Sequence, residues 1–107
     1  MPFDATPNET ETQYILREAA RIVRRGHIKG KYCNEAKTRF CLLGAIGMAA
    51  GLPVEPDACN LYPIKEVSEK VQRKLGVSMT HKWNDQRNRT AEEVASVLEA
   101  IANEEAN

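Results

Sequence analysis

The sequence predicts a mainly α-helical domain, with about four helices around one core and a small extended or hairpin insert after the first helix. Apolar residues make up 42% of the 107-residue chain, which is enough to bury a single core. Apolar positions recur at helical spacing in separate segments, and glycine or proline follows these segments. An α+β fold is the alternative if the insert forms true strands.

The first helix is expected to begin between Asn8 and Thr12 and to end before Gly26. Residues 1–8 contain two prolines and no periodicity, which predicts a disordered tail ahead of one globular domain over residues 9–107. Arg24 and Arg25 suit the negative end of the helix dipole. The apolar stripe of this helix consists of Ile15, Leu16, Ala19, Ala20, Ile22 and Val23.

Residues 27–40 contain a polar turn over residues 34–37 between two short arms, a pattern typical of a small hairpin. Residues 41–50 are almost wholly apolar, and therefore predict a buried and central second helix. Gly44 and Gly47 lie inside it, where each costs roughly 1 kcal/mol against alanine. We expect them to allow close approach by another element.

Residues 54–62 are expected to form a loop before a third helix from Pro63 to Leu75, which stops at Gly76. Residues 77–80 are expected to be a short extended piece. The last helix should run from Ala91 to about Ala102, because apolar residues recur there at helical spacing.

The segment before the last helix holds the only tryptophan of the chain, Trp83. We expect the ring to be a buried anchor, with Asn84 and Asp85 bonded to local backbone and Asp85 paired with Arg87 or Arg89. Thr90 and Glu93 have the spacing of a capping box. The predicted structural motif consists of Trp83, Asn84, Asp85, Arg89 and Thr90.

Fifteen basic and fifteen acidic residues cancel, so net charge gives no argument for attraction to nucleic acid or membranes. The basic residues are nevertheless concentrated between Arg17 and Arg39. They form a candidate phosphate-binding surface for a nucleic acid or nucleotide, or else the solvated face of an amphipathic helix. The residues proposed for it are Arg21, Arg24, Arg25, Lys29 and Lys31.

Several features predict a cytoplasmic protein that does not enter membranes. No apolar stretch approaches the roughly 20 residues that span a bilayer, and the N-terminus lacks the pattern of a signal peptide. The three cysteines are widely spaced, which suits a reducing compartment better than a disulfide framework. Since no close Cys or His pair is present, we expect no metal and no cofactor.

Cys41 stands where an apolar helix begins, and a helix N-terminus can favour a thiolate. His81 is a candidate base for it and Asp85, or Asn84, a candidate orienting group, which is the arrangement of a cysteine-dependent hydrolase. The alternative is that Cys41 is a small apolar residue of the core. We therefore expect a structural cysteine and keep the hydrolase as a hypothesis.

Three segments of the sequence form a recognisable set: Arg25-Gly26, residues 41–46 (Cys-Leu-Leu-Gly-Ala-Ile) and Trp83-Asn84-Asp85 with Arg89-Thr90. Together they resemble a family of small proteins from actinobacteria and their bacteriophages, described only as a domain of unknown function. The chain departs from the family pattern at His27, where an aromatic residue is usual, and at Leu42, where alanine is usual.

The resemblance implies a bacteriophage or bacterial cytoplasmic context and no particular reaction. The leading hypothesis is a small phage-type accessory protein that binds a host protein or defence component. Nucleic-acid or nucleotide binding and cysteine-dependent hydrolysis are the alternatives, and the oligomeric state is left open.

Overall fold

The computed structural model describes residues 10–52, 62 and 64–105. Within these residues the chain forms five helices and no strand longer than an isolated bridge, so the mainly α prediction is confirmed. The helices are α1 (Glu11–Arg25), α2 (Leu42–Ala49), α3 (Ile64–Leu75), α4 (Thr80–Asn84) and α5 (Ala91–Glu105). The tail predicted over residues 1–8, and the predicted loop apart from Tyr62, lie outside the described residues.

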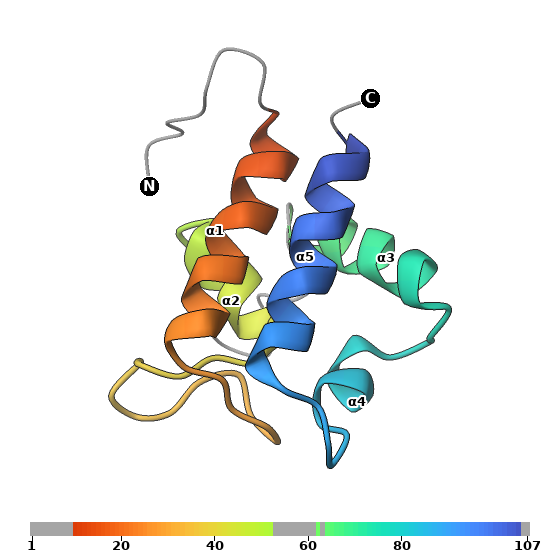
Figure 1. Ribbon diagram of the computed structural model, residues 1–107. Coiled ribbons are helices and arrows are strands. Elements are labelled where there is room, and N and C mark those ends of the chain that lie inside the picture. The colour runs from red at the N-terminus through yellow and green to blue at the C-terminus, as the bar shows by residue number, and fades with distance from the viewer. Residues whose placement is uncertain (1–9, 53–61, 63, 106–107) are drawn as a thin grey trace.

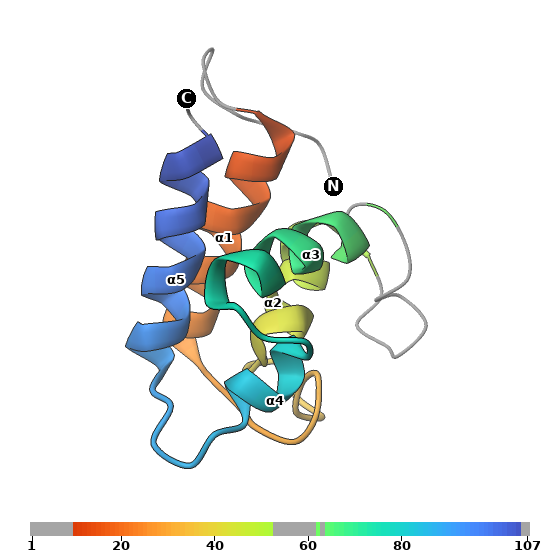
Figure 2. The ribbon, with the colours of Figure 1, turned by 90° about the vertical axis from the view of Figure 1, so that its right-hand side faces the viewer.

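The helices form two layers, with α1 and α5 side by side and antiparallel in one of them (Figure 1). Figure 2 shows α2 and α3 in the second layer, and α4 at the end where α1 finishes and α5 begins. As predicted, α2 is buried and central: it packs against α1, α3 and α4, and Met48 is its one exposed residue. None of the described helices is long and apolar enough to cross a membrane.

The first helix begins within the predicted window, because Thr10 and Gln13 cap each other. The Thr10 hydroxyl accepts from the Gln13 N–H at 3.1 Å, and the Gln13 side chain accepts from the Thr10 N–H at 2.8 Å. Gln13 also donates to the carbonyl of Ala102 at 3.1 Å, which ties the start of α1 to the end of α5. Both polar atoms of this buried side chain are thereby hydrogen-bonded.

The expected hairpin after α1 is only partly formed. The turn is present, with the Lys37 N–H donating to the Asn34 carbonyl at 3.0 Å, but the arms make isolated bridges and no ladder. Phe40 is shared between two segments, because it bridges to His27 in the parallel sense and to Cys33 in the antiparallel sense. Its N–H donates to Gly26 and its carbonyl accepts from Ile28, so the backbone groups of Phe40 are used by the segment directly after α1.

The second helix begins at Leu42, with the Cys41 side chain as its N-cap. The close approach predicted at Gly44 is confirmed, because a Cβ there would lie 2.0 Å from the carbonyl oxygen of Tyr32. That carbonyl accepts from the Cys41 N–H at 3.0 Å. Gly44 thus lets the insert pack directly on the first turn of α2.

The short helix α4 was not predicted, and it takes in the last residue of the extended piece expected over residues 77–80. Met79 is extended, and the helix starts at Thr80 and includes Trp83 and Asn84. Five residues are too few to show a periodic pattern in a sequence. The third helix ends before Gly76 as predicted, and α5 continues to Glu105, beyond the expected end near Ala102.

Candidate functional site

Asn84 is the centre of a buried polar cluster that we call the Asn84 joint (His27, Ile28, Leu42, Asn84 and Asp85). Its side-chain oxygen accepts from the Leu42 N–H at 3.1 Å and lies 2.7 Å from the His27 Nε2. Its amide nitrogen donates to the Ile28 carbonyl at 3.1 Å and to Asp85 at 2.9 Å. Because the Leu42 N–H fixes which amide atom is the oxygen, the His27 Nε2 must carry a proton.

The segment after α1 is bound to the segment after α4 by further contacts. Asp85 accepts from the Gly30 N–H at 3.0 Å, and the Lys29 ammonium donates to the carbonyls of Gln86 and Arg87 at 2.5 and 2.9 Å. Among the described residues Asp85 makes no ion pair with an arginine, so the predicted pairing was wrong. Asn84 likewise bonds to backbone that is distant in sequence, where local contacts were expected.

The prediction that Trp83 is a buried anchor is confirmed, since the side chain is 8% exposed. The Arg89 guanidinium lies 3.8 Å from the centroid of its ring and donates to the Trp83 carbonyl at 3.1 Å. Arg89 also pairs with Glu93 at 3.0 Å and bonds to the Gln86 side chain. The Thr90–Glu93 capping box is formed, and the Thr90 N–H, followed by Arg89, lowers the pKa of Glu93.

Cys41, His81 and Asp85 line one small cavity of about 180 Å³ at the start of α2, together with residues 30–32. The structure thus brings the three candidate catalytic side chains to one place. However, the Cys41 thiol is 4% exposed, and its Sγ accepts from the Gly44 N–H at 3.3 Å. Burial raises the pKa of the Cys41 thiol to about 11, so the thiol is neutral near pH 7. In the described chain no hydrogen bond joins it to His81.

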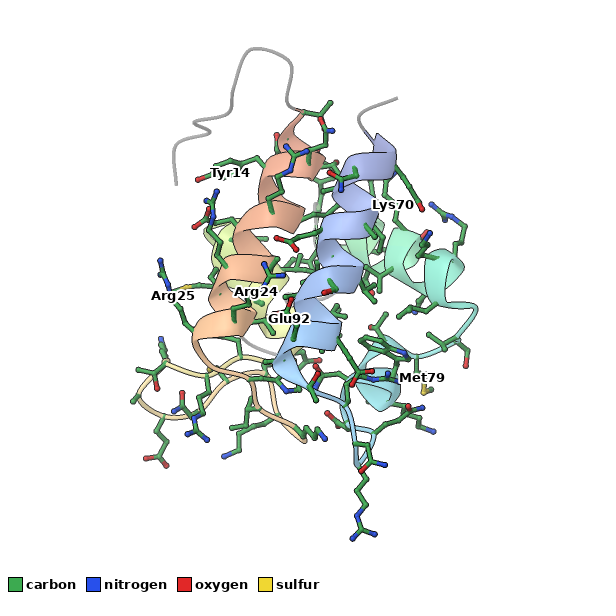
Figure 3. The ribbon with its side chains drawn as sticks, in the orientation of Figure 1. Tyr14, Arg24, Arg25, Lys70, Met79 and Glu92 are labelled. Carbon is green, nitrogen blue, oxygen red and sulfur yellow. The ribbon has the colours of Figure 1, made fainter. Side chains whose placement is uncertain are left out.

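The basic residues face different sides of α1. Arg24 points toward α5, where it pairs with Glu92 at 2.8 Å and with Glu99 at 2.6 Å (Figure 3). These bonds lower the pKa of both carboxyl groups and raise that of Arg24. Arg25 points away from α5, on the other side of α1 from Arg24 (Figure 3).

The other three candidate phosphate ligands are also dispersed. Arg21 pairs with Glu18 at 2.6 Å, Lys29 is bonded to backbone carbonyls, and Lys31 lines the cavity beside Cys41. The five cations therefore do not form one continuous surface. Nucleic-acid or nucleotide binding through them stays a prediction.

A larger open depression lies on the side of α1 that faces away from α5. We call it the groove; it has a volume of about 500 Å³ and is bounded by α1, residues 37–40 and α2. Met48, 43% exposed, is part of its apolar surface, and Arg25 and Lys37 are its cationic residues. Its lining is completed by Tyr14, Glu18, Ile22, Thr38, Phe40 and Ala49.

Sequence reasoning did not predict the groove, because its residues come from three segments. Ile22 was assigned to the core stripe of α1 and Met48 to a wholly buried helix, yet both contribute to this surface. A helix face that is simply exposed to solvent usually carries only polar residues. The face of α1 formed by Tyr14, Glu18, Ile22 and Arg25 mixes apolar and charged side chains, and this mixture was the one sign of the groove in the sequence.

The chain belongs to a family of unknown function (DUF6197), whose model matches residues 7–104. The resemblance drawn from the Cys41 and Trp83 segments was also to an uncharacterised domain family, and the match agrees with it to that extent. No curated protein and no solved structure matches the chain.

Proposed function

We propose that the protein acts by binding another protein, as a small phage-type accessory protein whose target is a host protein or defence component in the bacterial cytoplasm. The observation that carries this proposal is the groove. It presents an apolar surface with charged residues around it on a domain whose other described polar clusters are satisfied internally. A concave apolar surface with a polar rim is typical of interaction sites.

Two features of the groove support a macromolecular ligand over a small one. It is open and elongated along α1, whereas sites for small molecules enclose most of the ligand surface. Its floor also includes Met48, and flexible methionine side chains adapt well to the apolar residues of a protein partner.

The proposal is tested by photo-crosslinking in bacterial cells. A photoreactive amino acid is placed at Met48, inside the groove, or at Met79, which is equally exposed at 45% but lines a separate depression of about 510 Å³ on the α3–α4 side. We expect a discrete protein adduct from position 48 and none from position 79. If neither position, nor further exposed positions on α3 and α5, gives an adduct, the protein-binding function is wrong.

Cysteine-dependent hydrolysis is the second candidate, and one observation favours it: Cys41, His81 and Asp85 line the same cavity. The raised pKa of the thiol opposes it, because the thiolate is the nucleophile. Labelling of the native protein by a thiol reagent separates the two cases. Rapid labelling of Cys41 at pH 7, together with hydrolysis of a model ester that Cys41→Ala abolishes, would establish the hydrolase.

A further inference from the structure

We infer that the groove recognises an acidic segment of the partner protein, one that places apolar side chains on the floor and carboxylates beside Arg25 and Lys37. This inference rests on the proposed protein-binding function and adds the chemistry of the partner. It follows from the shape of the groove, its apolar floor and the sign of its unpaired charges.

The floor of the groove is apolar and firmly held. Phe40 and Ala49 are buried beneath it at 4% and 1% exposure, while Ile22 is half-buried and Met48 is exposed. Phe40 is fixed by backbone bonds to Gly26 and Ile28. An apolar side chain of a partner would therefore meet a preformed surface, which reduces the entropy that binding costs.

The charges around this floor are not balanced. Glu18 already accepts from Arg21 at 2.6 Å. By contrast, the exposed side chains of Arg25 and Lys37 make no hydrogen bond or ion pair with any described residue. The groove thus offers two cations without carboxylate partners, and electrostatic complementarity favours an acidic segment.

Lys37 supplies a second, independent observation. Its φ of 56° lies in the left-handed region, which glycine or asparagine adopts more readily than lysine. A lysine in this position is unfavourable for the turn itself. Its side chain lines the groove, so what lysine adds at this position is a positive charge in the groove.

The length of the groove suits a short amphipathic helix. Its α1 wall consists of Tyr14, Glu18, Ile22 and Arg25, which are spaced by four, four and three residues. This stripe of eleven residue steps extends about 16 Å along α1, or about three helical turns. Helices bind in such grooves through apolar residues at positions i, i+3, i+4 and i+7.

Other occupants fit less well. A second copy bound through the same face would bring four groove cations together with only two Glu18 carboxylates, which already pair with Arg21, so the excess of like charge disfavours such a contact. A nucleic acid would use the two cations but would leave the apolar floor without a matching surface.

The three methionines of the chain provide the test. The intact protein is labelled with ¹³C at the methionine methyl groups and titrated with a synthetic peptide of about 12 residues that carries leucine at i, i+3, i+4 and i+7 and glutamate elsewhere. We expect the Met48 signal to shift and saturate while Met79, equally exposed, stays in place. A peptide with lysine for each glutamate, or serine for each leucine, should not shift Met48.

A double substitution in the groove should weaken this binding without unfolding the protein. Arg25→Glu combined with Lys37→Asn is expected to weaken it about tenfold, equivalent to about 1.4 kcal/mol. Lys37→Asn should keep or raise the melting temperature, because asparagine tolerates the left-handed conformation. Arg73→Glu, at an exposed arginine of α3, is the matched control and should leave binding unchanged.

Several outcomes would overturn the inference: equal shifts with acidic and basic peptides, no shift of Met48, or a response of Met48 to RNA or anionic vesicles only. If the Met48 methyl signal shifts when the protein alone is diluted, and sedimentation shows a dimer, the groove binds a second copy of the chain. If crosslinking at position 48 captures a protein but the acidic peptide fails, protein binding survives and the acidic partner does not. If the acidic peptide fails and no exposed position tested, including 48, gives a crosslinked protein, both proposals fail.

Discussion

Asn84→Ala should destabilise the protein far more than the loss of a surface amide would. Asn84 is completely buried, and all of its side-chain hydrogen-bonding capacity toward His27, Ile28, Leu42 and Asp85 is used. Alanine would leave the Leu42 N–H without its partner at a fully buried position. A buried unsatisfied donor costs about 1–3 kcal/mol.

The remaining contacts of Asn84 add a smaller amount. His27, Ile28 and Asp85 are half-buried, so water can replace part of what they lose. The expected total is about 2–4 kcal/mol, out of the roughly 5–15 kcal/mol available to a small domain. The helix content should remain, because α1 and α5 do not depend on this side chain.

Urea denaturation followed by circular dichroism measures this free energy of unfolding. Asn88→Ala is the matched control, since Asn88 is an exposed amide four residues away, and its effect should stay within about 0.5 kcal/mol. An Asn84→Ala protein that unfolds at the same urea concentration as the parent would show that the joint does not hold α2, α4 and the insert together.

Three further predictions concern other parts of the molecule. Trp83→Ala should lower the free energy of unfolding by roughly 3–5 kcal/mol, because the ring belongs to the core; a variant with the parent's melting temperature but without partner binding would instead make Trp83 a contact residue. The pKa of Cys41 is raised from about 9 to about 11, so the free energy of unfolding should be unaffected below pH 9 and should fall between pH 9 and 11. Denaturation at several pH values should show this fall in the parent and not in Cys41→Ala; an equal fall in both would contradict the burial of the thiol. The pKa values of Glu92 and Glu99 are lowered chiefly by hydrogen bonds from Arg24, so their stabilising contribution should be complete above their ordinary pKa of 4.5 and disappear as the pH falls below it. Arg24→Gln should flatten this acid dependence, and salt should reduce it because the pairs are exposed; a profile unchanged by the substitution would mean that the pairs contribute nothing.

Local signals in the sequence predicted local structure well. The start of α5 follows from the reciprocal bonds of Thr90 and Glu93, which lie three residues apart. The end of α3 at Gly76 follows from a positive φ of 68° that glycine adopts readily. Each of these decisions depends on neighbours within one helical turn, and sequence spacing records such neighbours directly.

The rest of the site depends on contacts that no spacing records. Asn84 and Leu42 are separated by 42 residues, so the bond that holds the start of α2 could not be found from either segment. Arg24 and Arg25 are adjacent in sequence, yet one is paired with α5 and the other lines the groove. A count of positive residues therefore suggested one basic surface where the fold makes two separate sides of α1.

Apart from Arg25, which belongs to both sets, the residues that carry the family resemblance and the residues of the groove have different places in the fold, and this separation can be tested. Asn84 and Asp85 lie at the joint, whereas Lys37 and Met48 line the groove. A joint substitution such as Asn84→Ala should lower stability while each folded molecule keeps its affinity for the acidic peptide. Lys37→Asn should do the reverse. Because ligand binding stabilises only the folded state, peptide concentrations well above the Kd should raise the melting temperature of the parent and of Asn84→Ala equally, and that of Lys37→Asn less. A loss of affinity in folded Asn84→Ala would mean that the joint shapes the groove as well as the fold.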